Sequence, residues 1–210
     1  MNDTLQLLFA TPIVISDIPE IPQADHNYLL NAEYHKEAGS YEQFEKTKNT
    51  YILRGWKSDL NTWIEEQINI FAESALATRD KLKITQSWCL RHQDSVQNVY
   101  THSHPNSIIS GAYYLDAPEG TANIRFSKEE ALYSPFIRWE NDDELLNQQP
   151  WNWSWHEIPV QTGRLVLFPS YLKHGVTGNG INKNTRCVLS FNTWFNGPFG
   201  SADNLRALGD

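Results

Sequence analysis

The sequence has little of what marks a disulfide scaffold, a nucleic-acid-binding protein or a membrane protein. Its 210 residues include two cysteines, Cys89 and Cys187, which are too few for a disulfide framework and fit a reducing compartment. The 17 basic residues are outnumbered by 25 acidic ones and form no run that could neutralise a phosphate backbone. No window approaches the roughly 20 apolar residues of a membrane-spanning helix. We therefore expect neither nucleic acid nor a membrane as a partner.

The start of the chain also lacks the features of a secretory leader. The opening segment has no basic stretch and no cleavage site of small residues, and Pro12 interrupts its apolar run. We therefore expect a soluble, cytoplasmic protein.

Methionine, the flexible apolar residue, is scarce, whereas rigid aromatic residues are frequent. One methionine stands against eight tryptophans, which favours a preformed pocket. A chain of this length can build one substantial core, so we predict a single domain over residues 1–210.

Residues 1–82 are predicted to flank the core of that domain. The run Leu7–Ile15 reads as an extended strand whose proline places it at a sheet edge or a bend, and such an edge would offer a contact for a homodimer. A helix is indicated from Ser58 or Asp59, with Asp59 able to cap it, to Arg79. Apolar residues recur along it at steps of three and four, so one face should pack across a sheet: Leu60, Trp63, Ile64, Ile68, Phe71, Ala72 and Ala75.

Residues 83–196 are predicted to form the core, because the pattern changes there to short β-type runs separated by turn residues. The runs are 84–91, 96–102, 107–115, 122–126, 155–160, 164–169 and 186–195. Antiparallel strands of this number with flanking helices predict a mainly β protein with a double-stranded β-helix, also called a jelly roll or cupin-like fold. The segment 127–154 interrupts the runs. This segment is long and contains several acidic residues and three tryptophans, so we interpret it as a lid over a binding site. The alternative is a solvated acidic loop whose tryptophans pack into the core.

Three histidines are the candidate metal ligands. His102 and His104 are one residue apart, so in a regular strand both imidazoles leave the same face, roughly 6 to 7 Å apart at Cα. His174, which we place on a turn, could supply a third ligand if strands bring the two segments together. Such pairs also occur by chance on surfaces, and neutral imidazole suits iron, zinc, copper or nickel alike.

Arg186 is the candidate partner for an acidic ligand. It begins the last apolar run, so its guanidinium could point into the barrel with Ser190 on the same side of the strand. A buried Arg needs a partner, and the carboxylate of a small diacid would match its planar fork. The alternative is that the Arg186 guanidinium pairs with a carboxylate of the protein or extends to solvent.

Three blocks of the sequence, in this order, resemble one enzyme family. HSHPNSIISGAYYLDAPEG (102–120), TGRLVLFPSYLKHGVTGN (162–179) and TRCVLSFNTWF (185–195) are similar to the 2-oxoglutarate and iron(II)-dependent oxygenases, particularly the prolyl-hydroxylase-like branch and a group of microbial and viral members. The resemblance covers about residues 84–196 and, more loosely, the LFATPIVI start. It implies Fe(II) as metal, 2-oxoglutarate as cosubstrate and ascorbate as a candidate reductant.

The resemblance also assigns roles to individual residues. It implies that His102 is the first iron ligand and His174 the distal one, and that no catalytic side chain is required beyond the metal centre. Arg186 would bind the far carboxylate of 2-oxoglutarate, with Ser190 and Tyr114 as further contacts. The expected reaction converts 2-oxoglutarate to succinate and CO₂ while a C–H bond of a peptide or small-molecule substrate is hydroxylated.

The chain departs from the family pattern at one ligand. The family has His-x-Asp or His-x-Glu, whereas this sequence has His104 in the third position, which would make three imidazoles. A ligand set without a carboxylate leaves a bound ion with a higher net charge and puts its identity in question. A metal-holding, cupin-like binding protein and an inactive structural relative are therefore alternatives, and Arg186 discriminates because only a keto-acid enzyme needs that cation.

Overall fold

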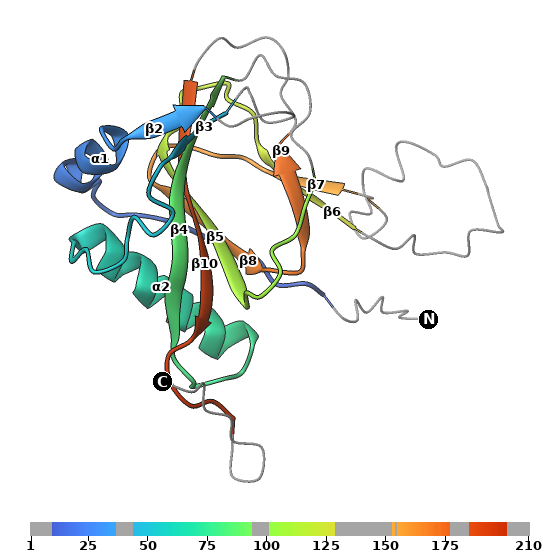
Figure 1. Cartoon of the computed structure of the whole chain (residues 1–210). Helices are drawn as coiled ribbons and strands as arrows, with labels where there is room; N and C mark the ends of the chain where they lie inside the picture. Colours follow the sequence, from blue (N-terminus) through green and yellow to red (C-terminus); the bar gives the residue numbers. More distant parts are fainter. Residues whose placement is uncertain are drawn as a thin grey trace, which may run out of the picture.

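The computed structural model describes residues 10–36, 44–93, 101–128, 153, 155–176 and 185–200. Within them the chain forms three layers: two helices, a seven-stranded sheet and a three-stranded sheet (Figure 1). The predicted strand 96–102 and the predicted lid 127–154 lie almost entirely outside the described residues.

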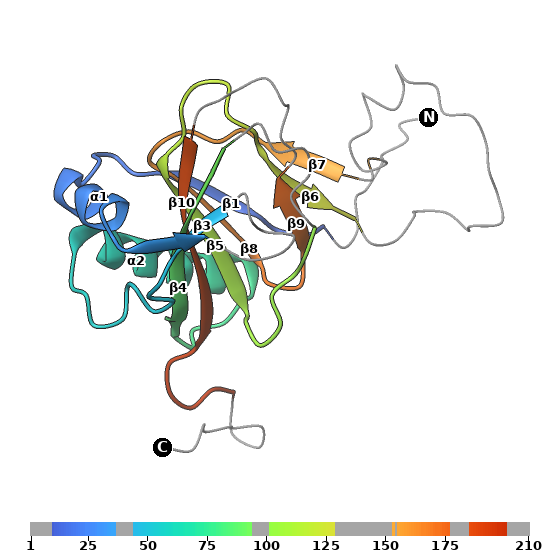
Figure 2. The same ribbon diagram turned by 45° about the horizontal axis from the view of Figure 1, so that its top comes forward.

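The large sheet is antiparallel throughout its ladders. Its order is β1 (Val14–Asp17), β8 (Arg164–Pro169), β5 (Ile109–Asp116), β10 (Thr185–Phe195), β4 (Leu82–Gln93), β3 (Phe44–Thr47) and β2 (Tyr34–Lys36). The small sheet is also antiparallel, in the order β7 (Trp155–Ile158), β6 (Ile124–Ser127) and β9 (Lys173–Val176). The small sheet faces the large one (Figure 2). Two facing antiparallel sheets confirm the predicted mainly β, jelly-roll fold.

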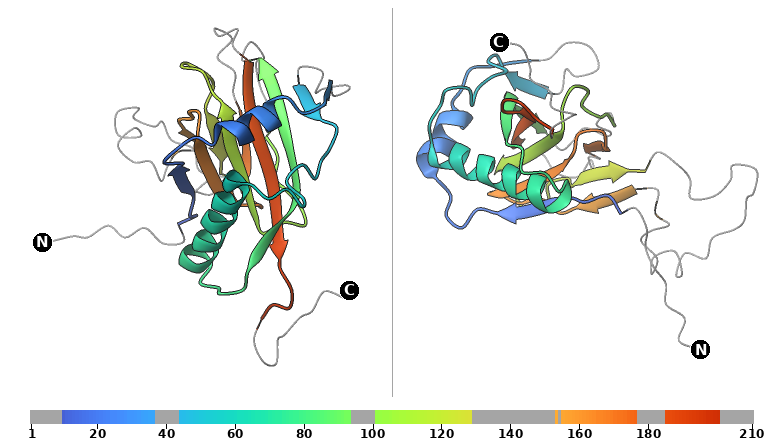
Figure 3. Two further views of the ribbon diagram at one scale, coloured as in Figure 1. Left: turned by 90° about the vertical axis from the view of Figure 1, so that its left-hand side faces the viewer. Right: turned by 90° about the horizontal axis from the view of Figure 1, so that it is seen from below.

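The helices α1 (Gln23–Leu30) and α2 (Asp59–Ala75) cover the outer face of the large sheet (Figure 3). The cap of α2 is Ser58, whose side chain accepts a hydrogen bond from the Asn61 amide at 3.1 Å, so the prediction of Asp59 as the cap was wrong. The helix also ends before the predicted Arg79. Ala77 has a φ of 51°, and this left-handed residue turns the chain away from the helix.

Two regions of strand were not predicted. β2 and β3 lie in a polar segment of the sequence, and both are stabilised by pairing with partners distant in sequence rather than by their own composition. His174 lies in β9 and not on a turn as predicted, because residues 173–176 pair with β6. The N-terminal strand was predicted over Leu7–Ile15, at a sheet edge or a bend; β1 begins only at Val14, and it lies at the edge of the large sheet.

Alternation along the strands divides the interior into two apolar layers. On β10, Cys187, Leu189 and Phe191 pack toward the helices, and Val188 packs toward the small sheet. Both cysteines are buried and free. At Gly111 a Cβ atom would lie 2.2 Å from Cζ of Phe191, so the ring on the helix side requires a glycine in β5. Neither helix described here has the length and apolar character needed to cross a bilayer.

Candidate active site

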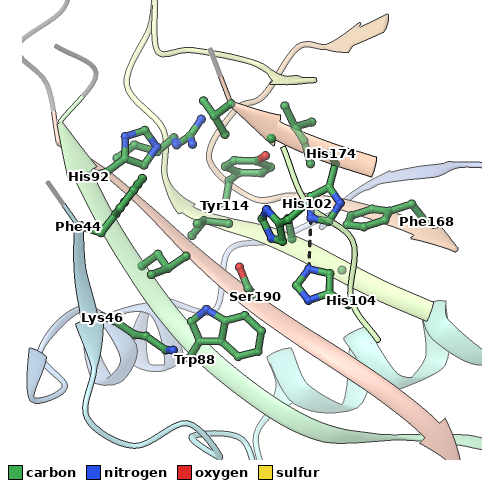
Figure 4. Close-up of a pocket in the computed structure, with 18 residues that line it drawn as sticks. Phe44, Lys46, Trp88, His92, His102, His104, Tyr114, Phe168, His174 and Ser190 are labelled. Carbon is green, nitrogen blue, oxygen red and sulfur yellow. Dashed lines mark hydrogen bonds between the residues drawn. The ribbon is translucent and has the colours of Figure 1, made fainter. Parts of the chain in front are cut away.

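A cavity of about 360 Å³ lies between the two sheets. Its walls come from β3, β4, β5, β8 and β10 of the large sheet on one side and from β6, β9 and the 102–104 segment on the other (Figure 4). The lining is largely apolar and aromatic, and it includes eight polar side chains: Lys46, His92, His102, His104, Tyr114, His174, Arg186 and Ser190. Such a cavity is typical of a site for small molecules.

Backbone hydrogen bonds bring the three predicted histidines together. His102 forms an isolated antiparallel bridge with His174, through amide-to-carbonyl bonds of 3.0 and 2.9 Å, and so continues the small sheet beyond β9. The His104 amide donates to the carbonyl of Ser170 at 2.9 Å. Main-chain hydrogen bonds between neighbouring segments therefore bring the three imidazoles close to one another.

The three rings form a compact triangle. Their centroids are 4.6 Å apart for His102 and His174, and 5.0 Å for each of the other two pairs. One ring nitrogen from each of the three lies within 4.8 Å of the others. The Nε2 atoms of His104 and His174 are 3.2 Å apart, close to the roughly 3 Å between two neighbouring nitrogens that each lie about 2.1 Å from one ion. The spacing thus fits one metal ion.

The protonation of His104 and His174 also suits a metal. Nδ1 of His174 donates to the carbonyl of Leu172 at 3.0 Å, which leaves the lone pair on Nε2, the atom facing His104. Burial is the main cause that lowers the pKa of His174 to about 3; the hydrogen bond to Leu172 opposes this shift and the neighbouring imidazoles add to it. Burial, with His102 beside it, likewise lowers the pKa of His104 to about 4. Both rings are neutral at physiological pH and can act as ligands.

Arg186 lies in the same cavity, where the sequence predicted it. The residue is 2% exposed, and its Nη1 donates to the carbonyl of Ala122. Its guanidinium carbon is 5.6 Å from the ring centroid of Tyr114. Burial raises the pKa of the Tyr114 hydroxyl to about 12, in spite of the nearby guanidinium, so the phenol keeps its proton and can donate it to an acceptor in the cavity.

Ser190 and two neighbouring side chains show how register builds the cavity wall. Ser190 of β10 is paired with Trp88 of β4 and with Ala112 of β5, so all three side chains leave the same face of the large sheet. Figure 4 shows Ser190 beside Trp88. The next row along the strands contains Lys46, Leu90, Val188 and Tyr114, and the row beyond it contains Phe44, His92 and Arg186.

The sequence reasoning missed Phe44, Lys46 and Trp88 as cavity residues. Phe44 and Lys46 come from β3, which was not predicted. Alternation within the short run Phe-Glu-Lys-Thr was the available signal, and four residues are too few to separate a strand from a loop. Trp88 lay in a predicted strand, but its direction depends on pairing with β10.

The fold and this site define a jelly-roll protein with a candidate metal centre and a buried cation in one cavity. A family model described as "Putative 2OG-Fe(II) oxygenase" matches residues 86–192, slightly more than half of the chain. The chain belongs to this family of oxidoreductases, which uses iron(II) and 2-oxoglutarate, and the resemblance seen in the sequence is confirmed. The prolyl-hydroxylase-like branch stays a prediction. A search of curated protein sequences finds no match.

Solved structures show the same fold at low sequence identity. The non-haem α-ketoglutarate-dependent epimerase SnoN from nogalamycin biosynthesis has a TM-score of 0.58 at 12% identity, covering 88% of this chain and 79% of its own. HygX from Streptomyces hygroscopicus, solved with nickel, 2-oxoglutarate and hygromycin B, has a TM-score of 0.53 at 11% identity, covering 87% and 82%. AviO1 from Streptomyces viridochromogenes Tue57 has a TM-score of 0.53 at 12% identity, covering 89% and 90%.

Proposed function

We propose that the protein is a 2-oxoglutarate and Fe(II)-dependent dioxygenase that hydroxylates a small-molecule or peptide substrate and releases succinate and CO₂. One observation carries the proposal: three imidazoles converge in the same cavity as a buried guanidinium. Family membership supports it, as does the nickel and 2-oxoglutarate bound by HygX, which shares the fold.

His102, His104 and His174 would hold the metal through ring nitrogens. Bound iron supplies the activation of O₂ and the oxidation of 2-oxoglutarate, and the protein supplies position and shielding. The Leu172 carbonyl orients the His174 ring, while the bridge between the backbones of His102 and His174 fixes both rings relative to each other. An ion held at these three ring nitrogens would face the same cavity that Arg186 lines.

Arg186 would bind the distal carboxylate of 2-oxoglutarate. Its fork can donate two parallel hydrogen bonds, and its burial removes the competition of water, so the pairing is strong and directional. Tyr114, whose hydroxyl keeps its proton, would donate a further hydrogen bond to the cosubstrate. Ser190 lies in the row of Trp88, which is the row next to that of Tyr114, and it would offer its hydroxyl to the same molecule.

Anaerobic titration with Fe(II) and 2-oxoglutarate tests the proposal. We expect the weak visible charge-transfer band of the iron chelate to develop with wild-type protein. Arg186→Ala should require at least tenfold more 2-oxoglutarate for the same band, because a charge-assisted pair of hydrogen bonds is lost. Arg54→Ala removes an exposed arginine and is the matched control, for which no change is expected.

Two outcomes would contradict the proposal. Wild-type protein that gives no band would favour a metal-binding protein of another kind, because the three imidazoles would then hold an ion without the keto acid. A band whose midpoint is the same in Arg186→Ala would remove the role of the guanidinium. Once a substrate is known, the oxygen content of the product separates hydroxylation from other outcomes, since SnoN is described as an epimerase.

A further inference from the structure

We propose that β3 and β4 form the primary-substrate subsite, and that it selects a small anionic molecule with a flat apolar body. Lys46 would bind the anionic group and Trp88 would contact the flat body. The inference rests on the proposed function, because it takes the triad and Arg186 as the places of the metal and the cosubstrate.

The register of the large sheet separates Lys46 from Arg186. Lys46 of β3 pairs with Leu90 of β4, and Leu90 pairs with Val188 of β10, which is the strand that carries Arg186 one row further along. Two strand spacings of about 4.8 Å therefore lie between the backbones of the two cations, and apolar Leu90 and Val188 occupy the row of Lys46 on the two strands β4 and β10. One cavity thus contains two separate cationic places.

Trp88 connects Lys46 to the histidine triad. Nζ of Lys46 lies 5.4 Å from the Trp88 ring centroid, and that ring centroid is 6.1 Å from the one of His104. Figure 4 shows Lys46 and His104 on opposite sides of Trp88. A molecule whose anionic end is held by Lys46 would extend along Trp88 toward the triad, which is where oxidation would occur.

The chemistry of this wall favours a flat, apolar body. The residues around Lys46 in the cavity are Phe44, Trp88 and Leu90, which offer aromatic and aliphatic surface and no hydroxyl or carboxylate. Trp88 is half-buried, so its exposed indole surface gains by covering an apolar group. Phe44 is held by an edge contact with His92, at 5.4 Å between ring centroids.

The charge of the assembled site favours an anion. A divalent metal and the dianion of 2-oxoglutarate balance each other, and the described lining contains no aspartate or glutamate. His104 stands where the family has a carboxylate, so that usual negative charge is missing too. Lys46 and Arg186 are both cations of the described lining, and surroundings of low dielectric strengthen the attraction between a cation and an anion.

The experiment compares phenylacetate with phenylacetamide, which have the same shape and differ in charge. Binding of each is measured by calorimetry to protein loaded with Mn(II), anaerobically, with and without 2-oxoglutarate. We expect wild-type protein to bind phenylacetate about tenfold or more tightly than phenylacetamide, as for a hydrogen bond to a charged group. Lys46→Met should abolish the preference and Lys46→Arg should keep it. Trp88→Leu should weaken both compounds alike.

Lys48→Met is the matched control. Lys48 is two residues away on the same segment and pairs with exposed Glu33 outside the cavity, so the preference for phenylacetate should persist in this variant. The inference is overturned if wild-type protein binds both compounds equally, or if Lys46→Met retains the preference. It is also overturned if Lys46→Met loses as much 2-oxoglutarate affinity as Arg186→Ala does, since Lys46 would then be a cosubstrate residue.

Failure of the proposed function gives a different result. Protein that prefers phenylacetate through Lys46 but shows no iron chelate band with 2-oxoglutarate would keep the anion subsite and lose the oxygenase. A chelate band in protein that does not distinguish the two compounds would keep the oxygenase and remove the subsite.

Discussion

His104 stands where the resemblance to the family implies a carboxylate, and its replacement is informative. We expect His104→Glu to keep metal affinity within about tenfold of wild type, because a carboxylate oxygen is a good ligand for iron and manganese. His104→Ala should lower that affinity much further, since one of three ligands is lost. Calorimetry with Mn(II) measures both variants, and exposed His35→Ala is the control. A Glu variant as weak as the Ala variant would mean that the site requires an imidazole.

A buried histidine away from the cavity should make stability depend on pH. Nε2 of His26 lies 2.7 Å from the Tyr113 hydroxyl, and burial lowers the pKa of His26 below its ordinary 6.5. The unfolded chain therefore takes up a proton below about pH 6.5 that the folded chain does not, and folding loses free energy as the pH falls. The contribution of neutral His26 to the free energy of unfolding is therefore fully present above about pH 6.5.

His26→Gln tests this dependence, because the amide can bond to Tyr113 and does not titrate. We expect urea unfolding at several pH values to show wild type losing stability relative to His26→Gln between about pH 6.5 and 5. Exposed His35→Gln should follow wild type. Parallel curves for wild type and His26→Gln would show that His26 does not contribute.

At the scale of the element, α2 depends on its N-terminal cap. Ser58→Ala removes the hydrogen bond to the Asn61 amide and should lower the free energy of unfolding by about 1 kcal/mol, whereas Ser58→Asp should keep most of it. Urea unfolding is the measurement. Ser74→Ala, on an exposed position of the last turn, is a control that should be neutral. An equal loss in the Asp and Ala variants would contradict a capping role.

Helices and strands were predicted correctly where a periodic pattern extends over a long segment, and they were missed where only pairing with a distant strand determines the structure. β10 and α2 were predicted because eleven and seventeen residues display a repeat of two or of three to four, which local sequence reveals. β3 and β9 have four residues each, and they exist because distant strands supply their hydrogen bonds. Phe44 and Lys46 were missed at the site for the same reason, because both lie in β3.

At the scale of the whole molecule, register decided what the sequence could not. The sequence predicted that His102, His104, His174 and Arg186 would face one cavity, and all four line it. The distances between the three histidines and Arg186 could not be predicted, because they depend on the bridge between His102 and His174 and on the register of neighbouring strands. Lys46 enters the cavity through the same register, and the four-residue run that contains it is too short to have predicted a strand.

Ligand binding between the two sheets should stabilise the whole fold. At a concentration about 100 times its Kd, Mn(II) contributes about 2.7 kcal/mol, which raises the Tm of a chain this size by roughly 5 to 10 °C. Differential scanning calorimetry should show that rise in wild type and a much smaller one in His102→Ala. Equal rises would place the bound ion elsewhere.

Gly111 makes the boundary between the two apolar layers one backbone thick. The ring of Phe191 presses against β5 from the helix side, while the other side of the same glycine lines the cavity. A side chain added at position 111 would therefore have to displace the Phe191 ring, and the damage would fall on the helix-side core and not on the cavity. The floor of the cavity at this point is bare main chain, and it stays so because the opposite layer leaves no room for anything larger than glycine.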